Sequence, residues 1–82
     1  MKRIIGTVTH YYGKIGVAVV RLTGALRLGD LVKFRSGKRE VEEAVVEIQV
    51  DHKDIPAAES GMEVGVKVHD PVEPGTKVTK LV

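Results

Sequence analysis

The chain has 82 residues, of which 43% are hydrophobic, and a net charge of +2. This length predicts one domain, residues 1–82, which buries about 60–65% of the surface that its unfolded chain exposes. The absence of cysteine excludes disulfides and thiolate metal sites.

A reducing compartment is the natural setting for a chain without cysteine, so we expect a cytoplasmic protein. No long apolar run begins the chain, and we expect neither a signal peptide nor a membrane partner. The sequence has no asparagine and one glutamine, which indicates a thermophilic source or chance in a short chain.

β-branched side chains dominate the apolar residues, with fifteen valines and five isoleucines. Such side chains suit a pleated, half-buried sheet better than a helix. Alternation between turn signals predicts six strands, in segments 3–9, 15–22, 31–35, 41–50, 64–68 and 77–82. In the first strand we expect Ile4 and Val8 to share one face, and Arg3, Thr7 and Thr9 to take the other. Residues 57–60 are expected to form one short helical turn.

A sharp corner is predicted at Gly29 and Asp30, which lead directly into the alternating strand 31–35. Glycine takes positive φ without steric cost, and aspartate tolerates turn geometry. A similar signal recurs at Pro74 and Gly75. Six strands joined by short turns can close on themselves and remove exposed edges. The sequence therefore predicts an all-β fold, a small closed six-stranded, antiparallel-rich β-barrel.

Both faces of the strand 15–22 are apolar. One face carries Gly16, Ala18, Val20 and Leu22. If this face points outward, it forms an apolar stripe for self-association or docking. The alternative is that a crossing strand covers it.

Charge is distributed unevenly along the chain. Residues 1–39 hold nine Lys and Arg side chains against one acid, and residues 40–63 hold eight acids against one base. A basic half can attract phosphate backbones. Alternatively, basic and acidic strands lie side by side and neutralise each other across the sheet.

The glycine and valine register resembles the second domain of translational GTPases, the β-barrel of elongation factor Tu and its relatives. The matching residues are Val17-Ala18-Val19-Val20, Gly24, Leu28-Gly29-Asp30-x-Val32, Val46-Glu47-Ile48 and Ala58-x-x-Gly61-x-x-Val64-Gly65-Val66. The resemblance spans residues 3–82 and implies a free-standing barrel of the translation-protein type. It implies contacts to the 3′ end of tRNA and to ribosomal RNA, with Glu47 near the terminal adenosine.

GTP is not expected to bind. The spacing from Gly24 to Gly29 matches a phosphate-binding loop, but Asp30 occupies the position of the lysine and would repel phosphate.

Two groups of residues are candidates for RNA contact. Tyr11 and Tyr12, beside Lys14, can stack an unpaired nucleotide, or they can plug an end of the barrel. Four bases flank the Ser36-Gly37 turn and form either a prong for RNA phosphate or a charged hairpin that blunts a sheet edge. These four bases are Lys33, Arg35, Lys38 and Arg39.

We expect no catalytic, metal or cofactor site. His10, His52 and His69 are too widely spaced for a metal motif, and the polar run 51–54 has no positioned partner for general-base chemistry. The sequence therefore predicts a non-catalytic binding module, with translation-linked RNA binding to tRNA or ribosomal RNA as its function. The alternative is a protein-interaction adaptor or self-associating barrel that docks on a partner enzyme.

Overall fold

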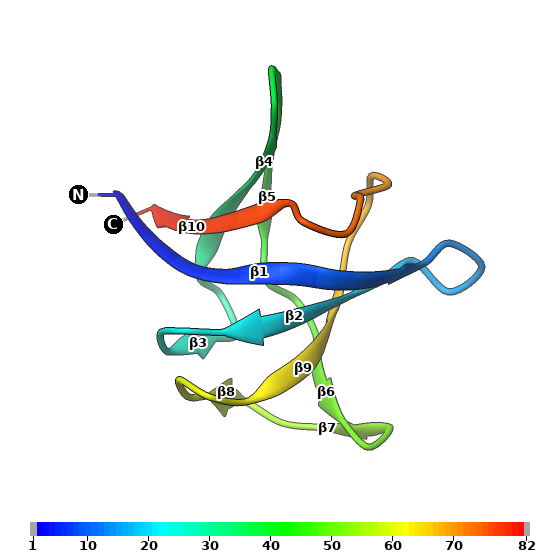
Figure 1. Cartoon of the computed structure of the whole chain (residues 1–82). Coiled ribbons are helices and arrows are strands. Elements are labelled where there is room, and N and C mark those ends of the chain that lie inside the picture. Colours follow the sequence, from blue (N-terminus) through cyan, green and yellow to red (C-terminus); the bar gives the residue numbers. More distant parts are fainter. Residues whose placement is uncertain (1, 82) are drawn as a thin grey trace.

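The computed structural model describes residues 2–81, and these form strands, turns and links with no helix (Figure 1). The strands are β1 (Lys2–Tyr12), β2 (Val17–Leu22), β3 (Leu26–Arg27), β4 (Leu31–Ser36), β5 (Arg39–Ala44), β6 (Ile48–Val50), β7 (Lys53–Asp54), β8 (Ala57–Ala58), β9 (Glu63–Lys67) and β10 (Lys77–Leu81). Eight of them make one antiparallel sheet in the order β5-β4-β10-β1-β2-β9-β6-β7, and β3 pairs with β8. The prediction of an all-β fold is confirmed.

The predicted closed six-stranded barrel is wrong. The sheet curls around a central core, but β5 and β7 end the ladder at its two sides (Figure 1). The segment predicted as one strand, 41–50, is in fact two strands joined by the link 45–47. β5 lies at one end of the sheet order and β6 lies near the other. The link 45–47 therefore crosses the gap between the two ends of the curled sheet, and we call this gap the seam. At the seam the two ends of the sheet are joined by the backbone of this link, and not by a complete ladder of hydrogen bonds.

A buried carboxylate makes a second connection across the seam. The Glu43 side chain, 5% exposed, leaves β5 and reaches the segment that follows β9. Its oxygens accept the N–H of His69 at 2.8 and 3.0 Å and the N–H of Asp70 at 3.3 Å. The His69 ring lies 3.1 Å from the same carboxylate but is largely exposed. Glu43 thus ties the β5 edge to residues 69–70, and we call this contact the Glu43 clasp.

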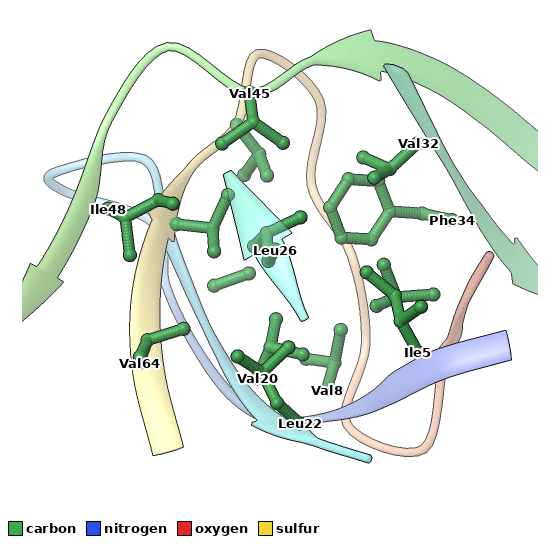
Figure 2. Close-up of a cluster of buried hydrophobic side chains, with 14 of the residues drawn as sticks. Ile5, Val8, Val20, Leu22, Leu26, Val32, Phe34, Val45, Ile48 and Val64 are labelled. Carbon is green, nitrogen blue, oxygen red and sulfur yellow. The ribbon is translucent and has the colours of Figure 1, made fainter. Parts of the chain in front are cut away.

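The core fills the inside of the curled sheet (Figure 2). Its side chains come from nearly every strand, so the packing of the core depends on how the strands pair. Among the most deeply buried are Ile5, Val8, Val20, Leu22, Leu26 and Ile48.

In the first strand, Ile4 and Val8 were expected to share one face, but only Val8 is buried. Ile4 is 60% exposed, whereas Ile5 and Val8 are each 1% exposed. The pairing between β1 and β10 shifts between Ile4 and Gly6, so Ile5 is an extra residue at a β-bulge. A bulge changes which residues face inward, and it bends the strand. Gly6 follows the bulge, where a Cβ would lie 2.7 Å from a methyl of Val20.

Two further expectations about local structure have clear outcomes. Residues 57–60 do not form a helical turn, because Ala57 and Ala58 pair with β3 instead. The corner at Gly29 is confirmed: Gly29 has φ +90°, and the Asp30 carboxylate accepts the N–H of Arg27 at 2.9 Å. The final predicted strand runs to Leu81, and its last predicted residue, Val82, lies outside the described residues.

The apolar face of β2 that could have formed an outward stripe is covered. Ala18, Val20 and Leu22 are buried in the core, so the second interpretation of this face holds. Val17 and Val19 occupy the opposite, outer face and remain half-buried. In the described part of the chain, no helix has the length and apolar character needed to cross a membrane.

Candidate functional site

The structure divides the residues proposed for RNA contact among separate places. Tyr11, Tyr12 and Lys14 lie at the hairpin between β1 and β2, which projects to the right in Figure 1. Tyr11 is half-buried and packs against the core. Tyr12 is 52% exposed, and its ring centre lies 6.3 Å from that of His10.

The four bases lie on the hairpin of β4 and β5, at the top of Figure 1. Lys33 lies 3.5 Å from Glu40 and 4.0 Å from Glu42, and Arg35 lies 3.5 Å from Glu40. These pairs support the interpretation that basic and acidic strands neutralise each other. Their outer face therefore offers little excess positive charge.

The remaining candidates lie apart from these pairs. Lys38 occupies the two-residue turn between β4 and β5, while Arg39 lines a pocket described below. Glu47 is half-buried on the link 45–47, near the opposite end of the sheet order. The eight predicted residues do not form one surface.

A groove with a volume of about 520 Å³ lies on the outer face of the sheet. It crosses β2, β9 and β6, and its floor contains the half-buried side chains of Val17 and Val19. Tyr12 and Ile15, both more than half exposed, stand at one end. The complete lining is Tyr12, Ile15, Val17, Val19, Gln49, Val50, Asp51, His52, Glu63, Val64 and Gly65.

Gly65 keeps the floor of the groove open. It pairs with Val19 across β2 and β9, and a Cβ at this position would lie 3.1 Å from Cγ1 of Val17. A glycine inside a strand often marks a close approach of this kind. A larger residue would fill the space between the valines, so the missing side chain helps to shape the groove.

One rim of the groove contains backbone that ordinary residues seldom adopt. Asp51 and His52 form the two-residue loop between β6 and β7, with φ angles of 51° and 64°. Two positive φ angles define a type I′ hairpin turn, for which glycine is the common second residue. Aspartate and histidine tolerate this region better than most residues, but the conformation still costs energy.

The groove was missed by sequence reasoning, although part of its signal was visible. Ile15, Val17 and Val19 alternate along one of the two apolar faces of the predicted strand 15–22, and the sequence left open which face points outward. The two faces of β2 are both apolar, and only the pairing of the strands shows which face meets the core. Within residues 2–81, no three His, Asp or Glu side chains gather in a way that could hold a metal ion.

The fold and the groove define a small all-β module with one partly apolar outer surface. No protein-family model matches the chain. The chain is 40% identical over 79 residues to an uncharacterized protease of Methanocaldococcus jannaschii, covering 94% of this chain and 19% of the relative. It therefore spans about a fifth of the length of that curated relative.

Solved structures extend this similarity to the whole fold. The C-terminal domain of a candidate U32 peptidase from Geobacillus thermoleovorans superimposes with a TM-score of 0.90 at 24% identity, covering 98% of this chain and 93% of that one. The selenomethionine variant of that domain gives a TM-score of 0.87 at 25% identity, covering 93% and 96%.

These similarities overturn the resemblance to the elongation factor Tu barrel. The proteins that the chain matches are named as a protease and as a peptidase domain, and not as translation factors. Translation-linked RNA binding is wrong for the same reason. The valine and glycine register that carried the resemblance describes a curled β-sheet, and a fold of this kind does not define a function.

Proposed function

We propose that this chain is a non-catalytic docking domain of the type found at the C-terminus of U32 peptidases, and that it packs its outer groove against the catalytic part of such an enzyme. The match of almost the whole chain to a U32 peptidase C-terminal domain carries this proposal. The chain covers 19% of the protease relative, so the rest of that relative is long enough to form a separate catalytic part.

The groove supplies a surface suited to this role. Its valine floor and its exposed Tyr12 and Ile15 offer apolar area that gains about 25 cal/mol per Å² when a partner covers it. Aromatic side chains are also common anchors in protein interfaces.

Amide hydrogen exchange can test the proposal in a full-length protein. The aligned 79 residues of the M. jannaschii relative are replaced by this chain, and exchange is compared with that of the isolated chain. We expect slower exchange in the chimera at residues 13–16 and 51–52, which border the groove, because docking excludes water there.

A matched pair of variants identifies the surface. Ile15, which is 58% exposed, lines the groove, whereas Ile4, which is 60% exposed, does not. Ile15→Asp should abolish the additional protection, and Ile4→Asp should retain it. Equal exchange in the isolated chain and the chimera, or equal effects of the two variants, would count against docking through the groove.

A further inference from the structure

The hairpin of β4 and β5 forms one wall of a pocket that is separate from the groove, and we call it the hairpin pocket. Its volume of about 220 Å³ is below the roughly 300–1,000 Å³ of sites for drug-sized molecules, so it suits a small ligand. The other wall is the loop between β9 and β10, and the lining mixes apolar, hydroxyl and charged side chains. The lining residues are Phe34, Ser36, Arg39, Val41, Pro71, Val72, Glu73 and Thr76.

Strand pairing places an arginine on the hairpin wall. Phe34 and Val41 are partners across β4 and β5, and Phe34 is buried in the core. Ser36 pairs with Arg39 two residues further along, and it shares this face because side chains alternate between the two faces of a strand. Arg39 therefore lines the pocket from the inner face of the hairpin, whereas Arg35 belongs to the outer face.

A tight turn places a glutamate and a threonine on the loop wall. The N–H of Thr76 donates to the carbonyl of Glu73 at 3.1 Å. Pro74 and Gly75 lie between them, and Gly75 has φ +93°, as a type II turn requires at its third residue. The N–H of Gly75 donates to the carbonyl of Val8 at 2.7 Å, and the N–H of Val8 donates to the carbonyl of Thr76 at 2.8 Å. The turn is therefore held on β1 and fixes this wall of the pocket.

The two charged residues of the lining have no ionic partner. Within residues 2–81 neither Arg39 nor Glu73 forms a salt bridge, whereas Lys33 and Arg35 on the outer face do. Since the two charges come from opposite walls and do not pair with each other, a molecule with one negative and one positive group can lie between them. A ligand with a single charge would leave either Arg39 or Glu73 without a partner.

The Thr76 hydroxyl gives independent support for a polar ligand in this pocket. The residue is 2% exposed, and within the described chain its hydroxyl has no hydrogen-bond partner. Buried polar groups are nearly always paired, and an exception needs an explanation. A hydroxyl can donate or accept a hydrogen bond, so either charged group of the ligand can satisfy it.

We propose that the hairpin pocket binds a small zwitterion, a free α-amino acid with an apolar side chain. Its carboxylate meets the Arg39 guanidinium, whose planar fork matches a carboxylate, and its ammonium group meets the Glu73 carboxylate. The apolar side chain contacts Val41, Pro71 and Val72. One ligand of this kind pairs both charges of the lining and covers its apolar part.

An NMR titration of the 82-residue chain with L-leucine tests the proposal. We expect saturable shifts at the amides of Arg39, Glu73 and Thr76 in the millimolar range of leucine. Isoamylamine is leucine without its carboxylate, and isocaproate is leucine without its ammonium group. Each should bind about tenfold more weakly than leucine, because each loses one charge-assisted contact.

Substitutions at the two charges show which group of leucine each one meets. Arg39→Gln should weaken leucine binding about tenfold and remove the preference for leucine over isoamylamine. Glu73→Gln should weaken it by a similar factor and remove the preference over isocaproate instead. Lys38→Gln and Glu59→Gln make the same changes in charge at exposed positions outside the pocket, and both chains should bind leucine as the parent does.

Several results would overturn the proposal. They are the absence of saturable shifts at tens of millimolar leucine, equal binding of leucine and its two analogues, and unchanged leucine binding after Arg39→Gln or Glu73→Gln. N-acetyl-leucine keeps the carboxylate and has no ammonium group. If it binds as tightly as leucine, the pocket receives the carboxyl end of a peptide and not a zwitterion. Because the hairpin pocket shares no lining residue with the groove, none of these results bears on the docking proposal.

Discussion

Removal of the Glu43 clasp should cost this chain much of its stability. Glu43→Ala leaves the backbone N–H groups of His69 and Asp70 without their acceptor and opens a space beside the core. A hydrogen bond to a charged group contributes about 1.5–3 kcal/mol, so loss of these two contacts should lower the free energy of unfolding by about 3 kcal/mol. For a domain of this size that corresponds to a fall in Tm of about 12–24 °C.

Urea and thermal unfolding followed by circular dichroism measure this loss. The neighbouring variant Glu42→Ala is the control, because its side chain is 56% exposed and lies 4.0 Å from Lys33. An exposed ion pair contributes less than about 1 kcal/mol, so this control should change Tm only slightly. His69→Ala should also have a small effect, since the His69 side chain is 78% exposed and its backbone N–H remains. Equal losses for Glu43→Ala and Glu42→Ala would refute the clasp.

Two stabilising substitutions should follow from unfavourable features of the folded chain. Thr76→Val removes a buried hydroxyl that has no partner, and we expect the free energy of unfolding to rise by about 1–2 kcal/mol in urea titrations. A decrease would show that the hydroxyl is paired in solution. His52→Gly relieves a φ angle of 64° and should stabilise the chain by about 1 kcal/mol, whereas Lys53→Gly, in the adjacent strand, should destabilise it. The same sign for both glycine variants would contradict the strain argued at His52.

The strands could be predicted from the sequence because their signals are local. Alternation of apolar and polar residues in Leu31–Arg35, bounded by turn residues on both sides, leaves few alternatives to a strand. The corner at Gly29 was visible for the same reason. By contrast, the bulge at Ile5 depends on how β1 meets β10, and one additional residue there changes which isoleucine is buried.

Closure of the sheet and the position of the site depend on contacts between distant segments. Glu40, Glu42 and Glu43 look alike in the sequence, yet only Glu43 points inward and meets residues 69–70. The groove has a similar origin, since the outer face of β2 becomes a floor only when β9 places Gly65 beside Val19. No pattern within a single strand contains that information.

The charges around the groove indicate what kind of partner it accepts. Asp51 and Glu63 line the groove, so this surface combines apolar area with acidic groups. Lysine or arginine side chains of a partner that surround the apolar contact should be attracted to it. Docking through the groove should therefore weaken as salt rises, because the screening length falls from about 10 Å at 0.1 M to about 3 Å at 1 M. The apolar share of the contact should persist at high salt.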